Sequence, residues 1–201
     1  FQGVYSDLWT DTISNAVANN VVVVAAGGDS NEVYDDRPTT WRSPICNDGP
    51  NYTDNNVIGV GATDRYDRVW YWWVEGSATD ESSRSFIDVM APGESIVSCT
   101  VYDPAVSGFG YGYGTMTGCS MASGVVAGVA SLVRAQFPQF TPAAVANQIR
   151  SAADNIDAEN SEYVGFIGAG RVNADRALDD MPPALPRSIT AYDTPNDSGG
   201  S

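Results

Sequence analysis

Two short runs of apolar, mostly β-branched residues limit the folds that this chain can adopt. They read VVVVAA at residues 21–26 and VIGVGAT at residues 57–63. Unbroken apolar runs of this length are typical of strands that are buried on both faces of a parallel sheet. Apolar residues at helical spacing over 8–19 lead directly into the first run. A helix that leads into a buried strand predicts an α/β fold with a mostly parallel sheet.

The rest of the pattern predicts further strands and the loops between them. We expect strands at 69–74, 85–90 and 95–99, a turn at 91–93, and loops at 32–56 and 103–117. The helical segments follow these strands. We expect one buried helix from Ser120 to about Gln136, another that begins at Thr141 and Pro142, and a short one near 173–179.

The last twenty or so residues differ in composition from the rest. Residues 182–201 are rich in Pro, Asp, Ser and Gly and are interpreted as a linker to a further domain. Residues 1–181 are then expected to belong to one domain. The chain begins at Phe1 without Met and has no signal peptide, so we expect a processed product or a fragment.

The charge of the chain excludes one class of partner. The 201 residues include 25 acidic and 10 basic residues, for a net charge of −15, and His and Lys are both absent. Nucleic-acid binding needs a positive face, so a nucleic-acid partner is not expected. The charge fits high solubility, calcium attraction, a salty habitat or the acidic surface of a secreted protein. No apolar run is long enough to span a membrane.

One serine lies where a turn of small residues becomes an apolar helix. The stretch TGCSMASGVVAGVASLV covers residues 117–133 and contains Ser120 at this junction. Backbone N–H groups at a helix start are unpaired, so Ser120 could attack a carbonyl while its own N–H holds the oxyanion. Gly118 would let a substrate backbone approach closely. A serine that merely caps the helix fits the same residues, and both interpretations remain open.

Several segments resemble one family of enzymes. GCSMASGVVAG (118–128) resembles the signature around the nucleophile of subtilisin-like serine proteases, with Ser120 at that position. Four other segments resemble the family in the correct order: 19–31, 55–64, 87–98 and 163–178. The resemblance implies a three-layer α/β fold with a mostly parallel sheet. It also implies that peptide bonds are hydrolysed through an acyl-enzyme on Ser120.

The catalytic base is the first departure from the family pattern. A serine without a neighbouring base is a poor nucleophile, and this chain has no His or Lys to serve as one. In the family, the catalytic Asp and His lie upstream. FQG (1–3) resembles the end of the strand that lines the specificity pocket. The chain is therefore expected to be the C-terminal portion of the domain, with an N-terminal segment carrying Asp and His as its partner.

Asp29 is the second departure, because the family usually has Asn at this oxyanion-hole position. An ionised carboxylate would repel an oxyanion, so Asp29 could donate a hydrogen bond only when protonated. Some subtilisin relatives have Asp here, as do the sedolisins, which are acid-active serine-carboxyl proteases with a motif close to GGDSN (27–31). Met121 favours the subtilisins. The alternative is that the alignment of this chain with the family is shifted by one or two residues. Asp29 would then be a solvated turn residue beside Gly28.

Three substitutions inside the signature form the third departure. Cys119 replaces Thr, and it is an alternative nucleophile, a small buried residue, or half of a disulfide with Cys46 or Cys99. Three cysteines are too few for a disulfide scaffold, and their odd number leaves one unpaired. Gly124 and Val125 replace Pro and His and are expected to alter packing more than chemistry.

The resemblance also implies a substrate site and a metal. Substrate would lie as a β-strand between Gly3 and the segment Ala26, Gly27 and Gly28, with Gly118 beside Ser120. Structural Ca²⁺ is common in the family, and Asp88 falls at a weak cation site. Solvated acidic loops are the alternative, since no segment has convincing calcium-ligand spacing. The family is mostly secreted, so a secreted or cell-surface location is expected.

Three functions are compatible with these residues. The first is a secreted serine endopeptidase with Ser120 as nucleophile and Asp29 in the oxyanion hole. The second is an inactive subtilisin-like module that binds peptides or serves a structural role. The third is a sedolisin-like acid protease.

Overall fold

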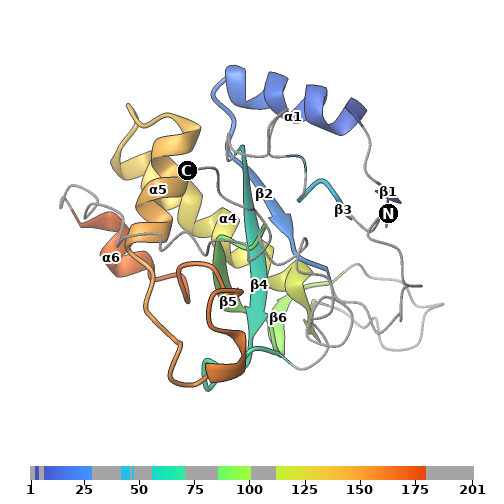
Figure 1. Ribbon diagram of the computed structural model, residues 1–201, viewed down its shortest axis with the longest axis vertical. Coiled ribbons are helices and arrows are strands. Elements are labelled where there is room, and N and C mark those ends of the chain that lie inside the picture. The colour runs from blue at the N-terminus through green and yellow to red at the C-terminus, as the bar shows by residue number, and fades with distance from the viewer. Residues whose placement is uncertain are drawn as a thin grey trace, which may run out of the picture.

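A parallel sheet, in which the structure describes three strands, forms the centre of the molecule (Figure 1). The computed structural model describes residues 3–4, 7–28, 42–45, 47, 56–70, 86–100 and 112–179. Strands β2 (Val23–Ala26), β4 (Val57–Thr63) and β5 (Val89–Pro92) pair in the order β2-β4-β5, and both pairings are parallel. Every residue of β4 is buried, as the apolar run predicts. The expected α/β fold with a mostly parallel sheet is confirmed.

Two glycines in β4 allow neighbouring segments to approach the strand. A Cβ atom at Gly59 would overlap the carbonyl oxygen of Phe86, and one at Gly61 would overlap the sulfur of Met90. Glycine in a strand interior often marks such a close approach. The run VIGVGAT therefore combines strand-forming residues with two positions that have no room for a side chain.

Residues 170–172 extend the sheet beyond β5. The Met90 N–H donates to the Gly170 carbonyl and the Val172 N–H donates to the Met90 carbonyl, both at 2.8 Å. An antiparallel bridge then joins Arg171 to Asp154. Segments far apart in the sequence thus complete the edge of the sheet on the β5 side.

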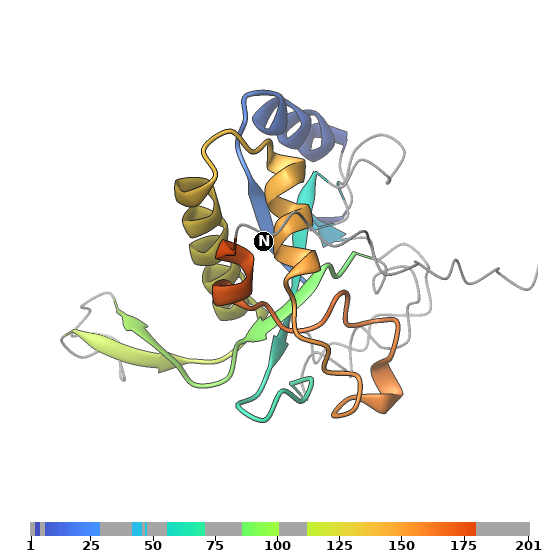
Figure 2. The same ribbon diagram turned by 90° about the vertical axis from the view of Figure 1, so that its left-hand side faces the viewer.

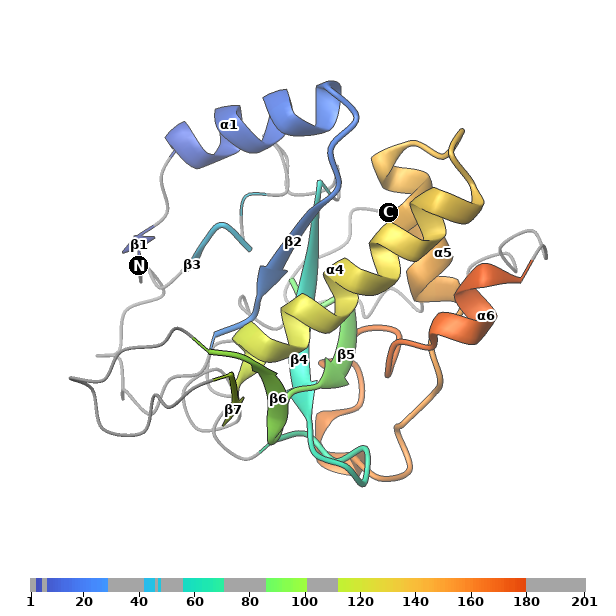
Figure 3. The ribbon, with the colours of Figure 1, turned by 180° about the vertical axis from the view of Figure 1, so that it is seen from behind.

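Helix α4 (Cys119–Gln136) lies across one face of this sheet and packs on β2, β4 and β5 (Figure 3). Helices α5 (Pro142–Ser151) and α6 (Ala174–Leu178) pack beside α4, and α1 (Asp7–Ala18) contacts β2. The predicted start of α5 is confirmed, because the Thr141 hydroxyl accepts a hydrogen bond of 3.2 Å from the Ala144 N–H. None of the helices that the structure describes is long and apolar enough to cross a membrane.

Two short antiparallel pairs and one 3₁₀ turn lie outside the central sheet. Strand β1 (Gly3–Val4) pairs with β3 (Arg42–Ser43), and β6 (Ile96–Cys99) pairs with β7 (Tyr113–Met116). The 3₁₀ helix η1 spans Ser161–Tyr163. The pair β6–β7 projects from the body of the molecule, and we call it the arm (Figure 2).

The structure corrects two of the expected loops. Strand β7 lies inside the expected loop 103–117, and β3 lies inside the expected loop 32–56. Three of the four residues of β7 are exposed, so the alternation of apolar and polar residues that reveals a half-buried strand is absent. The pairing with β6, which is a long-range contact, determines this strand instead.

The boundaries of two strands also differ from expectation. Strand β5 runs through Ala91 and Pro92, which pair with the last residues of β4, so the turn begins at Gly93 rather than at residue 91. Strand β2 begins at Val23, because the end of α1 folds into a turn in which the Val21 N–H donates to Ala16. Of the expected strand 69–74, the described part forms one bridge between Val69 and Thr63. Residues 71–74 and the expected linker lie outside the described residues.

Candidate active site

Ser120 is the second residue of α4, and its side chain is exposed. The N-cap of the helix is Gly118, whose carbonyl accepts from the N–H groups of Met121 (3.1 Å) and Ala122 (3.2 Å). No side chain caps this helix end. The Ser120 hydroxyl has no hydrogen-bond partner among the described residues. The interpretation of Ser120 as a helix-capping residue is therefore wrong.

The backbone around Ser120 is suited to bind a negative charge. The Ser120 N–H donates no hydrogen bond among the described residues, whereas the next two N–H groups donate to Gly118. Helix α4 is 18 residues long, so its dipole favours an anion at this end. Gly118 has φ 149° and ψ 168°, a region that glycine almost alone adopts. This conformation explains the need for glycine immediately before Cys119 and Ser120.

The structure decides between the interpretations of Cys119. Its side chain, at the first position of α4, is completely buried, whereas the neighbouring Ser120 is exposed. Cys99, on the arm, is exposed, and neither of these two thiols forms a disulfide among the described residues. Cys119 is thus a small core residue and cannot reach a substrate in this conformation. Cys46 lies outside the described residues.

Two hydrogen bonds hold the two residues that precede Cys119, and a third anchors one of their partners, Gly93. The Gly118 N–H donates to the Gly93 carbonyl (2.9 Å), and the Gly93 N–H donates to the carbonyl of Thr63 at the end of β4 (3.0 Å). The Ser95 N–H donates to the Thr117 hydroxyl at 2.9 Å. The sequence analysis did not identify Gly93, Ser95 or Thr117 as part of the site. The APG turn was the only local signal, because these bonds join residues more than 20 positions apart.

The end of β2 lies beside the start of α4 (Figures 1 and 3). Ala26 is the last residue of β2, the Gly27 N–H continues the pairing by donating to Val60 (2.8 Å), and Gly28 has φ 98°. Gly3 lies in β1, where its partner is Ser43 of β3 rather than β2. Asp29 lies outside the described residues, so its place in the oxyanion hole stays a prediction.

Asp88 is held by protein groups rather than being open to a cation. Its carboxylate accepts from the Gly59 N–H (2.8 Å) and from Arg150 (2.6 Å). Burial raises the pKa of Asp88, and the Arg150 charge and the Gly59 hydrogen bond oppose that rise. Among the described residues, no three His, Cys, Asp or Glu side chains cluster to hold a metal. Asp88 therefore does not fit a calcium site, and it is not a solvated loop residue either.

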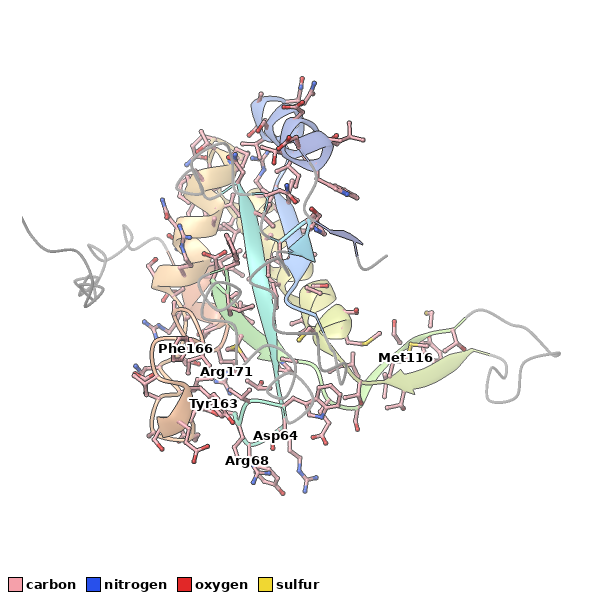
Figure 4. The ribbon with its side chains drawn as sticks, turned by 45° about the vertical axis from the view of Figure 1, so that its right-hand side comes forward. Asp64, Arg68, Met116, Tyr163, Phe166 and Arg171 are labelled. Atoms are coloured by element: carbon pink, nitrogen blue, oxygen red, sulfur yellow. The ribbon has the colours of Figure 1, made fainter. Side chains whose placement is uncertain are left out.

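A second group of ion pairs lies at the edge of the sheet beyond β5. Arg171 pairs with Asp67 (2.8 Å) and Asp154 (2.7 Å), and Arg176 also reaches Asp154. In Figure 4, Arg171, Asp64 and Arg68 lie in the lower part of the body, apart from Met116 on the projecting arm. This cluster joins the extended edge of the sheet to the loop after β4 and takes no part in the candidate active site.

Comparisons with known proteins agree with this geometry. A model of the subtilase family, named Peptidase_S8, matches residues 3–170. The extracellular protease of Xanthomonas campestris pv. campestris is 34% identical over 178 residues, which cover 88% of this chain. Mycosin-2 of Mycobacterium tuberculosis is 31% identical over 169 residues, which cover 75% of this chain. The solved structure of a protease from Pseudoalteromonas arctica superposes with a TM-score of 0.64 at 26% identity over 89% of the chain.

The chain spans only part of each of these proteins. The matched segment covers 26% of the Xanthomonas protein, 29% of mycosin-2 and 48% of the Pseudoalteromonas chain.

Proposed function

The chain belongs to the subtilase family, and on that premise we propose that it carries the nucleophile of a serine endopeptidase. The observation that carries this proposal is the position of Ser120. Its hydroxyl is exposed and unpaired among the described residues, and its own N–H, in the first turn of α4, has no acceptor among them either. A nucleophile and an oxyanion donor on one residue suit acyl transfer.

The reaction would proceed in two steps. The Ser120 Oγ attacks the carbonyl carbon of the scissile peptide, and the oxyanion forms within reach of the Ser120 N–H. The amine then leaves with a proton, and water hydrolyses the ester on Ser120. Asp29, in its protonated form, is the proposed second donor to the oxyanion.

The base in the subtilisin-like arrangement is a His, and because this chain contains none, that base would come from outside it. A segment that precedes Phe1 in the same precursor would supply a His, held by an Asp, to accept the Ser120 proton. The exposure of Ser120 supports this assignment, since a hydroxyl covered by the described residues would have no room for such a base.

The proposed substrates are peptides and proteins in extended conformation. The segment Ala26, Gly27 and Gly28 ends a strand next to the start of α4 and offers main-chain groups for strand pairing. Gly118 leaves space beside Ser120 for the substrate backbone. Gly3 would line the other side of the substrate. A secreted or cell-surface location accompanies this function, as for the extracellular relative.

The absence of His from this chain also supports a second function, that of an inactive module. If no His-bearing segment accompanies the chain in the native protein, Ser120 has no proton acceptor. The site would then bind extended peptides without cleaving them, or the fold would serve a structural role.

The experiment that separates these functions is labelling of the purified full-length protein with a fluorophosphonate. Peptide mass spectrometry should find the adduct on Ser120, and Ser120→Ala should abolish it. The matched control is Ser131→Ala, which removes an exposed hydroxyl that bonds to Ala127 (2.9 Å) on the same helix, and it should label like the wild type. Every co-purifying chain is sequenced for a His-bearing segment. Folded, inhibitor-free protein without an adduct on Ser120 would reject the nucleophile and favour the inactive binding or structural module.

A further inference from the structure

Thr117 occupies the junction between the arm and the helix that begins with the nucleophile. It directly follows β7 and precedes Gly118. Its hydroxyl accepts a hydrogen bond of 2.9 Å from the N–H of Ser95, the residue directly before β6. The last pair of the arm's ladder on this side is Ile96 with Met116. The side chain of Thr117 thus closes the base of the arm where the backbone ladder stops.

The backbone that follows Thr117 needs support from its surroundings. Gly118 adopts φ 149° and ψ 168°, a sparsely populated region, and such residues persist only where the surrounding structure holds them. On one side the Gly93 carbonyl accepts from the Gly118 N–H. On the other side Ser95 holds Thr117. Two bonds from one short segment therefore determine the direction in which the chain enters α4.

The segment that provides these bonds is itself anchored in the core. The Gly93 N–H donates to Thr63 at the end of β4, all of whose residues are buried. A Cβ atom at Gly93 would lie 2.8 Å from the Gly118 carbonyl oxygen and 2.7 Å from the Cβ of Ala62. Gly93 therefore packs directly against both the core strand β4 and Gly118, and it links the core to the residue before α4.

We infer that Thr117 is a positioning residue for Ser120, acting through its hydrogen bond to Ser95. This inference rests on the proposed function of Ser120 as a nucleophile. Thr117 does not touch the reacting atoms in this assignment. Its hydroxyl sets the backbone three residues before Ser120, and small displacements of a reacting group cost large factors in rate. Loss of the bond would leave the fold intact, because both Thr117 and Ser95 are exposed.

The test compares four forms of the full-length protein in their rate of labelling by a fluorophosphonate. They are the wild type, Thr117→Val, Thr117→Ser and Thr115→Val. Thr115 is an exposed threonine of β7 whose hydroxyl makes no hydrogen bond among the described residues, so it is the matched control. Each variant is measured over a range of probe concentrations, and its melting temperature is recorded beside its labelling rate.

We expect Thr117→Val to label Ser120 at least about fivefold more slowly at saturating probe, a change that corresponds to one hydrogen bond. Thr117→Ser should restore the rate, and Thr115→Val should match the wild type. All four melting temperatures should agree within a few degrees.

Two results would overturn the inference, and a third concerns the proposed function instead. Equal labelling of Thr117→Val and Thr115→Val would show that the hydroxyl does not position Ser120. A loss of rate that follows the melting temperature, without rescue by Thr117→Ser, would show a structural role only. Absence of any adduct on Ser120 of the wild type would reject the proposed nucleophile itself.

Discussion

Asp88 and Arg150 form a part-buried ion pair in which Oδ1 and Nη1 lie 2.6 Å apart. Asp88 comes from the segment before β5 and Arg150 from α5, so the pair joins the sheet to the helical layer. The Gly59 N–H binds the other carboxylate oxygen at 2.8 Å. Only 13% of the Asp88 side chain and 25% of the Arg150 side chain are exposed, so screening by solvent is limited.

Arg150→Gln should destabilise the protein near neutral pH. The change leaves an ionised carboxylate part-buried without a counter-charge, which costs about 2–4 kcal/mol of unfolding free energy. Burial raises the pKa of Asp88 above its usual 3.8, so the folded state binds the Asp88 proton more tightly than the unfolded state does. This proton binding stabilises the fold fully at pH values below 3.8, and the stabilisation is lost as pH rises through the raised pKa. The cost of Arg150→Gln should therefore shrink as pH falls towards 4.

Urea unfolding of wild type and variant at pH 7 and pH 4 measures this difference. Asp88→Asn combined with Arg150→Gln is the control, because the neutral pair should recover part of the stability lost at pH 7. An equal loss of free energy at both pH values would contradict the electrostatic explanation.

Asp154→Asn should show the opposite dependence on pH. Partial burial alone would raise the pKa of Asp154, but hydrogen bonds from Arg171, Asn173 and Arg176 hold it below 3.8. Because its pKa is lowered, the ionised Asp154 carboxylate stabilises the fold at pH values above about 3.8. This stabilisation is lost as pH falls through the lowered pKa. We expect a loss of about 1–2 kcal/mol at pH 7, equivalent to the charged hydrogen bonds removed.

The same urea titrations test this second variant, now from pH 7 down to pH 3. Asp157→Asn is a suitable control, because no arginine pairs with Asp157 among the described residues. A difference between wild type and Asp154→Asn that widens in acid would contradict the assignment.

Gly59→Ala should prevent normal packing of the segment before β5. The added methyl group would overlap the Phe86 carbonyl, which is backbone and cannot rotate away. It would also push the Asp88 carboxylate away from the Gly59 N–H, so we expect a loss of more than about 3 kcal/mol of unfolding free energy.

Gly124, in α4, provides the control. An added Cβ there meets no described atom within 4 Å, so Gly124→Ala should change the free energy of unfolding by less than about 1 kcal/mol. Circular dichroism melts of both variants make the comparison, and equal melts would contradict it.

Asp29→Asn should change the pH dependence of peptide hydrolysis. An ionised Asp29 repels the oxyanion, whereas an amide donates to it at any pH, so kcat/KM at pH 8 should rise about tenfold or more. The difference between the two proteins should narrow as pH falls, because a protonated carboxyl can donate to the oxyanion as an amide does. Initial rates on a peptide substrate from pH 4 to pH 9 test this, with Asp11→Asn in α1 as control. If kcat/KM of the wild type and of Asp29→Asn depended on pH in the same way, the assignment of Asp29 to the oxyanion hole would be rejected.

Local patterns in the sequence account for the elements whose residues carry a strong signal. The apolar run at 57–63 became β4 with the expected limits, and the apolar helix that begins near Ser120 became α4. Thr141 caps α5 as its residue type predicts. These predictions succeed because burial on both faces, helical periodicity and capping are all properties of consecutive residues.

The features that depend on distant partners could not be derived from any local pattern. The exposed strand β7 exists because β6 pairs with it, and β5 extends through Pro92 because β4 continues beside it. The fold also places Arg150, 62 positions away in the sequence, on the Asp88 carboxylate, so that Asp88 does not fit the cation site that its resemblance implied.

The features of the candidate active site fall into the same two groups, those set by local sequence and those set by distant partners. The sequence by itself determined that Ser120 follows a glycine at the start of a buried helix, since the residue types and their order carry that information. Only the tertiary structure decided that Ser120 is exposed while Cys119 is buried, and that Gly93 and Ser95 hold the chain before them. Burial and long-range hydrogen bonds depend on which surfaces the fold brings together, and consecutive residues do not encode that choice.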